Sequence, residues 1–157
     1  PSAITRLIDI GVKPFLVASS IQAVMAQRLI RMNCKECNAP RDPSTVDPKL
    51  MRLVGITNEE AMGRLKKGKG CGNCSNTGYR GRRAIFEMML MNAALRELAF
   101  NLAPISDLRR AAMLAGMRSL VQDGKIKILN GQTTPEEIAS TTQVDIDNLP
   151  DVEEAAA

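Results

Sequence analysis

Residues 34–74 have the sequence CKECNAPRDPSTVDPKLMRLVGITNEEAMGRLKKGKGCGNC, a segment that begins and ends with a Cys-x-x-Cys pair. The two pairs contain all four cysteines of the chain: Cys34, Cys37, Cys71 and Cys74. Two residues between cysteines allow a tight turn that points both thiolates at one ion, and two such turns complete a tetrahedral shell. Because the chain has no histidine, no imidazole replaces a thiolate and no open coordination position is indicated. The pattern therefore predicts a closed, structural metal site, with zinc favoured over iron.

Two alternatives to a metal remain open: two disulfide bonds, or four cysteines that are buried independently. Disulfides are rare in a reducing cytoplasm. We expect this chain to be cytoplasmic, because residues 1–6 lack the basic and apolar regions of a signal peptide. A thioredoxin-type redox pair would need only one Cys-x-x-Cys motif in a β–α–β context, which is not indicated. Nor does any apolar stretch approach the roughly 18 residues that a membrane-spanning helix needs.

A basic stretch overlaps the second cysteine pair. Residues 61–86 contain no acidic residue, and the whole chain has a net charge of +4. The cations of this stretch are Arg64, Lys66, Lys67, Lys69, Arg80, Arg82 and Arg83. They either offset the charge of about −2 on a zinc ion bound by four thiolates, or form a surface for phosphate, nucleic acid or acidic lipid. Arg80 and Arg82 are candidates to contact acidic phospholipid or the nucleotide of a neighbouring subunit, with solvated, charge-balancing side chains as the alternative.

No catalytic residue or nucleotide site is predicted in this chain. Gly63-Arg-Leu-Lys-Lys-Gly68-Lys69 matches the start of a phosphate loop, but Gly70 stands where a magnesium-binding hydroxyl is required. We therefore expect a flexible basic loop here. The absence of histidine excludes serine–histidine and cysteine–histidine catalytic pairs. Carboxylate pairs such as Glu136/Glu137 are expected only to stabilise the first turn of a helix. The chain alone is predicted not to hydrolyse nucleotide.

Capping residues and periodicity predict a mostly helical chain. Helices are expected at Ser2–Ile10 before Gly11, from Pro14 to about Val24, after Asp47, after Thr57 with Glu60 in a capping box, at Ala93–Asn101, at Ser106–Ala115 before Gly116, from Ser119 to Gly131, and after Thr134. The clearest strand is Arg83–Leu90. Residues 25–32 fit either a helix or a strand, because period alone does not distinguish the two.

Several stretches of the sequence resemble one protein family. They are Ala-Ile-Thr-Arg-Leu-Ile-Asp-Ile-Gly-Val-Lys-Pro-Phe-Leu-Val-Ala-Ser-Ser (3–20), Ala-Gln-Arg-Leu-Ile-Arg (26–31), Gly-Tyr-Arg-Gly-Arg (78–82), Ile-Phe-Glu (85–87), Asp-Gly-Lys-Ile-Lys (123–127) and Gly-Gln-Thr-Thr-Pro-Glu-Glu-Ile (131–138). Together with the tetracysteine insert, they make residues 3–143 similar to the end of the motor domain of type II secretion and type IV pilus assembly ATPases, the GspE/PilB family.

The resemblance implies the C-terminal part of a hexameric, ATP-driven motor at the cytoplasmic face of the inner membrane, which powers pseudopilin or pilin assembly. In the family, the phosphate loop, the Walker B carboxylate and the histidine box precede this segment, so ATP and Mg²⁺ would belong to the parent motor. The implied partners are the other subunits of the homo-hexamer and the cytoplasmic part of an inner-membrane secretion or pilus platform protein. Acidic phospholipid is a further expected ligand.

The implied fold class is α+β and mostly helical. By resemblance, the chain divides into the C-terminal edge of a RecA-like α/β core (1–33), the tetracysteine zinc-binding subdomain (34–77), a strand returning to the core (78–92), a helical C-terminal subdomain (93–143) and a flexible acidic tail (144–157). Met25–Arg31 would then be a strand paired with Arg83–Leu90.

A zinc-ribbon module that binds nucleic acid is the alternative function. It would use the basic residues between positions 64 and 83 to contact phosphates, with an affinity that falls steeply with salt. Aromatic residues make up only 3% of the chain and tryptophan is absent, so platforms for base stacking are scarce. Nucleic acid is therefore the less favoured partner.

Overall fold

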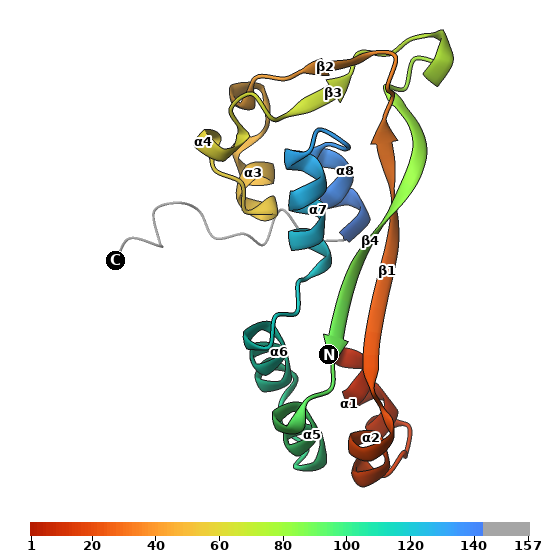
Figure 1. Cartoon of the computed structure of the whole chain (residues 1–157), viewed down its shortest axis with the longest axis vertical. Coiled ribbons are helices and arrows are strands. Elements are labelled where there is room, and N and C mark those ends of the chain that lie inside the picture. Colours follow the sequence, from red (N-terminus) through yellow and green to blue (C-terminus); the bar gives the residue numbers. More distant parts are fainter. Residues whose placement is uncertain (143–157) are drawn as a thin grey trace. The chain divides into compact units, whose positions relative to one another are not determined.

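Two long strands pair with each other in the structure, a computed structural model that describes residues 1–142. Strand β1 (Ala23–Asn33) and strand β4 (Tyr79–Leu90) form a two-stranded sheet, and Figure 1 shows them running in opposite directions. The pairing that the family resemblance implies is therefore confirmed, and both strands are longer than predicted. With eight α-helices and two small sheets among the described residues, the chain is a mixed α/β protein.

Contacts divide the described chain into two compact units, each built from two separate segments. The first unit comprises Pro1–Ala26 and Phe86–Ser119, and the second comprises Gln27–Ile85 and the residues from Leu120 onward. The expected helical segment 93–143 thus contributes helices to both units, and the domain boundaries given above remain predictions. The expected acidic tail at 144–157 lies outside the described residues. Within residues 1–142, no helix is both long and apolar enough to span a membrane.

The first unit packs four helices around an aliphatic and methionine-rich core. The helices are α1 (Ser2–Asp9), α2 (Pro14–Ser20), α5 (Ala93–Phe100) and α6 (Ile105–Leu114). The buried core consists of Ile4, Val17, Ala18, Met89, Met91, Leu95, Ala99, Leu108, Ala112 and Met117. The predicted extension of the second helix to Val24 is wrong, because the chain has already entered β1 at Ala23.

An arginine holds the end of α2 at this earlier position. The Arg96 guanidinium donates hydrogen bonds to the backbone carbonyls of Ala18 and Ser19, and to the Oε1 atom of Gln22 at 3.1 Å. The last carbonyls of a helix have no partner within the helix, so a cation at this end satisfies them and also interacts favourably with the helix dipole. The partner lies far away in sequence, which is why local patterns did not predict this helix end.

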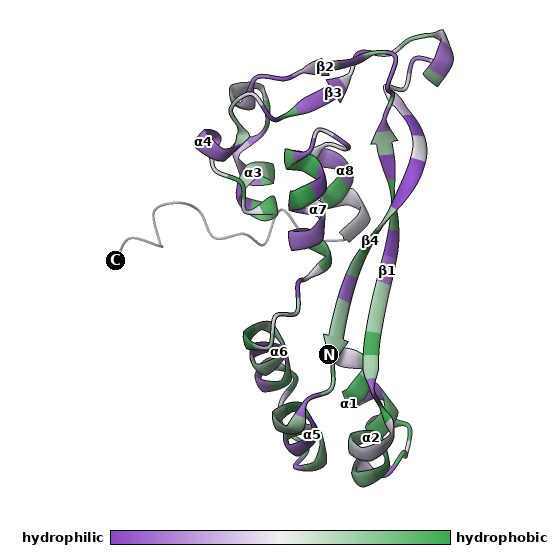
Figure 2. Ribbon diagram, in the orientation of Figure 1, coloured by the Kyte–Doolittle hydropathy of each residue, from purple (hydrophilic) through white to green (hydrophobic). Residues whose placement is uncertain are grey.

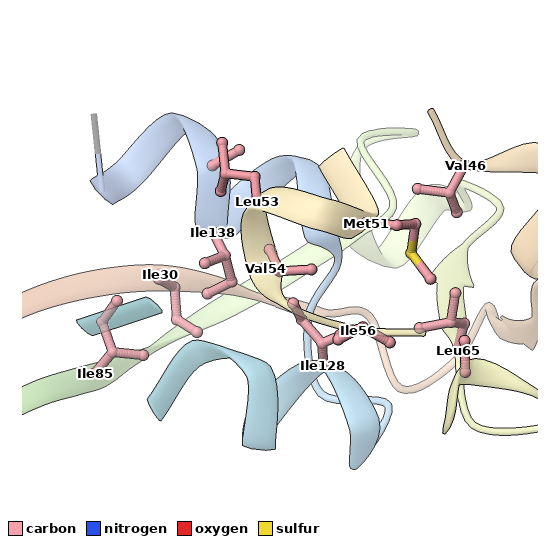
Figure 3. Packing of buried hydrophobic residues seen from close by; sticks show 12 residues of the cluster. Ile30, Val46, Met51, Leu53, Val54, Ile56, Leu65, Ile85, Ile128 and Ile138 are labelled. Atoms are coloured by element: carbon pink, nitrogen blue, oxygen red, sulfur yellow. The ribbon is translucent and has the colours of Figure 1, made fainter. Parts of the chain in front are cut away.

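The second unit surrounds the inserted segment with the C-terminal helices. Its elements are β2 (Asn38–Pro40), the 3₁₀ turn η1 (Pro43–Thr45), α3 (Pro48–Val54), α4 (Asn58–Ala61), β3 (Lys66–Gly68), the 3₁₀ turn η2 (Gly72–Cys74), α7 (Leu120–Leu129) and α8 (Pro135–Thr142). Figure 3 shows the residues of this core that meet: Ile30, Val46, Met51, Leu53, Val54, Ile56, Leu65, Ile85, Ile128 and Ile138. The insert therefore shares one core with helices that come later in the sequence.

The two predicted helix starts within the insert are confirmed. The Asp47 carboxylate accepts the backbone N–H of Lys49 at 2.8 Å, directly before Pro48 in the first turn of α3. Thr57 and Glu60 form the reciprocal capping box at the start of α4. Each cap satisfies backbone donors that a helix leaves unpaired at its N-terminus.

A short sheet, which the sequence did not predict, joins the two ends of the insert. Strand β2 pairs antiparallel with β3, with Asn38 opposite Gly68 and Pro40 opposite Lys66. The expectation of a flexible basic loop at 63–70 is therefore corrected, because backbone pairing fixes part of it. A phosphate loop leads into a helix, whereas this segment leads through β3 to the second cysteine pair. That no nucleotide binds here remains a prediction.

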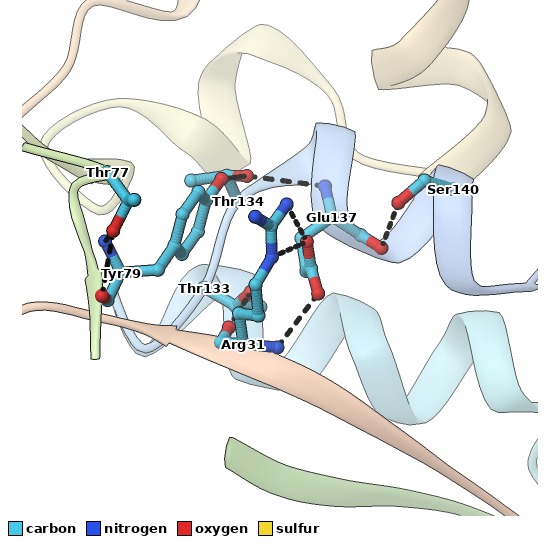
Figure 4. A network of polar contacts seen from close by, with 7 residues as sticks. All are labelled: Arg31, Thr77, Tyr79, Thr133, Thr134, Glu137 and Ser140. Carbon is cyan, nitrogen blue, oxygen red and sulfur yellow. Dashed lines mark hydrogen bonds and ion pairs between the residues drawn. The ribbon is translucent and has the colours of Figure 1, made fainter. Parts of the chain in front are cut away.

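A buried carboxylate fastens α8 to β1. Glu137 is 5% exposed and accepts the backbone N–H of Arg31 at 2.8 Å, its Nε–H at 2.8 Å and its Nη2 group at 2.6 Å. The Thr133 hydroxyl donates to the Arg31 carbonyl at 2.8 Å, and the Tyr79 hydroxyl lies 2.7 Å from that of Thr134 (Figure 4). Glu137 does lie in the first turn of its helix, as expected, but its main contacts are with a strand.

Glu137→Gln is expected to lower the free energy of unfolding by about 1–3 kcal/mol, because the substitution removes the charge from hydrogen bonds to a guanidinium. Urea unfolding followed by circular dichroism measures the change. Glu59→Gln is the matched control, since Glu59 is exposed in the first turn of α4; a change below about 0.5 kcal/mol is expected there. Equal effects of the two substitutions would contradict the role of the Glu137 contacts.

Candidate metal centre

The first cysteine pair lies between the end of β1 and the start of β2. The backbone N–H of Cys34 donates to the carbonyl of Gly78 at 2.9 Å, next to the point where β4 begins. The carbonyl of Cys37 accepts the N–H of Lys69 at 3.1 Å, directly after β3. Backbone hydrogen bonds thus hold this turn against the segments on both sides of the second pair.

The second cysteine pair forms a tight turn around η2. The backbone N–H of Cys71 donates to the Cys74 sulfur at 3.2 Å, and the N–H of Gly78 donates to the same sulfur at 3.3 Å. Ser75 and Asn76 then adopt left-handed conformations, with φ of 50° and 60°. These conformations reverse the direction of the chain after the second pair. The two amides hold the Cys74 sulfur, which lies 3.9 Å from the sulfur of Cys37 in the first pair.

All four sulfurs lie within 4.8 Å of one another. The separations are 3.9 Å for Cys34–Cys71, 3.9 Å for Cys37–Cys74 and 3.7 Å for Cys71–Cys74. A metal–sulfur bond of about 2.3 Å in a tetrahedron places neighbouring sulfurs about 3.8 Å apart. The sulfurs are too far apart for a disulfide, which needs about 2.05 Å, and all four cysteines are free. The cluster has the geometry to hold a metal ion.

Backbone amides favour the thiolate form at two of these positions. Desolvation opposes ionisation of Cys74, but the N–H groups of Cys71 and Gly78 outweigh it and lower the pKa of the thiol to about 6. For Cys34, amides of its own turn likewise outweigh desolvation and lower the pKa. Desolvation, with the neighbouring thiols, raises the pKa of Cys37 to about 11. A bound cation would favour the thiolate at every position, because metal ligands must be deprotonated.

Two glycines allow the end of β3 to touch the second turn. A Cβ atom on Gly68 would lie 2.0 Å from the carbonyl oxygen of Gly78, and one on Gly78 would lie 2.5 Å from the oxygen of Gly68. Only residues without a side chain permit this backbone approach. This contact was not predicted, although the glycines on either side of the second cysteine pair were a signal for it.

Arg80 and Arg82 follow the second pair at the start of β4. The Arg80 guanidinium donates to the carbonyl of Asn73 at 2.6 Å, so this side chain lies against the second cysteine turn. The Arg82 side chain is exposed. The cysteines are thus brought together, while the two arginines lie beside their cluster. That Arg80 and Arg82 contact acidic phospholipid or the nucleotide of a neighbouring subunit remains a prediction.

Comparison with known proteins gives consistent matches over nearly the whole chain. A family model described as type II/IV secretion system protein matches residues 1–141. The type IV pilus assembly ATPase PilB of Thermus thermophilus is 38% identical over 141 residues, which cover 89% of this chain and 16% of that protein. Type II secretion system protein E of Pseudomonas aeruginosa is 38% identical over 90% of this chain and 27% of its own length. Type II secretion system protein HxcR of the same organism is 40% identical, with 90% and 26% covered.

These relatives are much longer than the chain. The matched region amounts to 16%, 27% and 26% of their respective lengths. The match therefore does not assign to this chain any activity that depends on the remaining parts of those proteins.

Proposed function

The chain belongs to the type II/IV secretion system protein family, and on this basis we propose that it is the C-terminal zinc-binding portion of a hexameric secretion or pilus assembly ATPase. The parent motor would power the assembly of pseudopilins or pilins, with ATP and Mg²⁺ bound outside this segment. The observation that carries the proposal is the cluster of four sulfurs inside a chain whose relatives are named as secretion and pilus assembly proteins. Those names favour this function over a nucleic-acid-binding module.

Zinc is the metal that we propose for the cysteine cluster. Four sulfur donors with separations near those of a regular tetrahedron suit a structural zinc ion, which needs no open position. The proposed role is to fasten the two ends of the insert, in addition to the short β2–β3 sheet. Metal binding would then contribute directly to the folding of the second unit.

An exposed apolar strand face supports the proposal that β1 and β4 form the edge of a larger RecA-like core. Phe86, Met88 and Leu90 alternate along β4 and are 41%, 49% and 62% exposed. Figure 2 shows that β4 changes from hydrophilic residues at its start to hydrophobic residues at its end. Two-stranded sheets are marginally stable in water, and exposed apolar faces mark contact sites. We infer that the preceding part of the motor domain covers this face.

The remaining parts of the proposal concern the assembled motor. Its partners would be the other subunits of a homo-hexamer and the cytoplasmic part of an inner-membrane platform protein, and its location would be the cytoplasmic side of that membrane. Family membership supports this general setting. The finer assignments, including the choice between secretion and pilus assembly, rest on experiments with the parent motor.

The purified chain is expected to contain about one zinc ion per molecule and to release no phosphate from ATP above the buffer background. Elemental analysis measures the metal, and a phosphate-release assay measures hydrolysis. The full-length parent motor, assayed in parallel, is the positive control for ATP hydrolysis. A metal content near zero would refute the zinc site. Sustained ATP hydrolysis by the chain alone would refute the proposal that ATP binds outside this segment of the parent motor.

A further inference from the structure

A small pocket beside the metal centre is lined by three arginines. Its volume is about 260 Å³, and it lies within the second unit. The lining residues are Arg31, Thr77, Tyr79, Arg80, Gly81 and Arg82. Among these described residues there is no carboxylate, so the walls of the pocket carry only positive charge. Like charges gathered in one place favour the binding of an anion.

The position of the first guanidinium is fixed by protein contacts. Glu137 accepts hydrogen bonds from Nε and Nη2 of Arg31, and the guanidinium lies over the Tyr79 ring, 4.3 Å from its centroid. The Tyr79 hydroxyl is paired in turn with Thr134 (Figure 4). Even so, the Arg31 side chain is 54% exposed, so it is held in place without being withdrawn from solvent.

The other two guanidiniums differ in how they are held. Arg80 is attached through Nη1 to the Asn73 carbonyl at 2.6 Å. The guanidinium of Arg82 is exposed, and within residues 1–142 no carboxylate or carbonyl is found to hold it. Glu137 offsets the charge of Arg31 only, and the pocket therefore retains the charge of two further cations. A ligand would meet two positioned guanidiniums and one that is free to close on it.

We propose that this arginine pocket binds a phosphate dianion. Guanidinium groups form paired, charge-assisted hydrogen bonds to phosphate oxygens. A terminal phosphate, with a charge of about −2 and three free oxygens, can satisfy three arginines better than a single carboxylate can. Tyr79 is the single aromatic residue among the lining residues, and Arg31 occupies one face of its ring, so stacking of a nucleobase is poorly supported. The ligand is therefore recognised through its phosphate, whether a soluble nucleotide or a lipid headgroup carries it.

This inference goes beyond the proposed structural role of the metal, although the two are linked. The carbonyl that holds Arg80 belongs to Asn73, between the two cysteines of the second pair, so the pocket is complete only when that turn is folded. Measuring zinc in every sample separates the two proposals. Failure of the metal proposal gives protein without zinc, and failure of the phosphate proposal gives zinc-loaded protein that binds no phosphate.

Isothermal titration of the zinc-loaded chain with inorganic pyrophosphate at low ionic strength is expected to show saturable binding that weakens as salt is added. Arg82→Gln should lower the affinity about tenfold or more, because it removes one charge-assisted contact and disturbs no contact among the described residues. Arg28→Gln is the matched control. Arg28 is exposed in β1 and does not line the pocket, so the Arg28→Gln variant should bind pyrophosphate with the affinity of the unchanged chain.

Further ligands identify the source of the phosphate. Tighter binding of ATP than of phosphatidic acid vesicles, whose headgroup is a terminal phosphate, assigns the pocket to a nucleotide. The reverse order assigns it to a lipid surface, and Arg82→Gln must weaken whichever ligand binds. Phosphatidylcholine vesicles control for lipid without net charge. Three results would overturn the proposal: no saturable binding, equal loss of binding in Arg28→Gln, or a poly-glutamate peptide that binds as tightly as pyrophosphate.

Discussion

Cys74→Ser is expected to abolish zinc binding and to destabilise the second unit of the chain strongly. The substitution removes one of the four sulfurs that we propose as metal ligands, and it is the sulfur that accepts the N–H groups of Cys71 and Gly78. Structural zinc contributes about 10–16 kcal/mol in zinc-finger peptides, as much as the whole stability of a typical domain, about 5–15 kcal/mol. The midpoint of thermal unfolding should therefore fall by more than about 10 °C. Elemental analysis and circular dichroism measure the two effects.

Lys35→Ser is the matched control for this prediction. Lys35 lies between the two cysteines of the first pair, is exposed and offers no sulfur, so zinc content and unfolding midpoint should match those of the unchanged chain. If the chain is part of the motor that we propose, Cys74→Ser in that full-length motor should also stop pseudopilin or pilin assembly, whereas Lys35→Ser should not. If the Cys74 variant lost its metal yet unfolded at the original temperature, the ion would have no structural role.

Gly68→Ala is expected to lower the free energy of unfolding by about 3 kcal/mol or more, the upper part of the range for overpacked sites. The added Cβ would lie 2.0 Å from the Gly78 oxygen, and backbone has no rotamer with which to move away. Separation of the two segments would break the pairing of β2 with β3, or the hydrogen bond from Cys34 to Gly78. Urea unfolding of the zinc-loaded protein measures the loss.

Gly72→Ala provides the comparison for Gly68. Gly72 lies in η2 between the cysteines of the second pair, has no atom within 4 Å of the position of an added Cβ, and is not among the glycines with positive φ. The same chemical change should therefore cost less than about 0.5 kcal/mol there. If Gly68→Ala were equally mild, the close backbone approach would be wrong.

The cluster of cysteines and the caps of the insert could be predicted because their causes are local. Cys-x-x-Cys spacing determines how a turn directs its sulfurs, and Asp47 and Thr57 act on backbone groups two or three residues away. Residues 25–31 were different, since periodicity left them open and only the family resemblance indicated a strand. Zinc as the bound ion, and the ligands of Arg80 and Arg82, remain predictions.

What the sequence analysis missed depends on partners that lie far along the chain. The end of α2 is held by Arg96, and Glu137 is buried by Arg31, more than 70 and 100 residues away respectively. The β2–β3 sheet has few apolar residues to mark it, because backbone pairing and two glycines hold it in place. No local pattern in a single sequence identifies such pairings.

The discontinuous make-up of the two units has a consequence for synthesis on the ribosome. The first unit is incomplete until its second segment, which ends at Ser119, has been made. The second unit lacks the core residues Ile128 and Ile138 until α8 emerges. During that interval the apolar side chains of α3, such as Met51 and Val54, have no partner helices to cover them. The nascent chain therefore exposes apolar side chains of an incompletely packed insert, and any pause in translation before codon 138 prolongs the period in which chaperones must shield them.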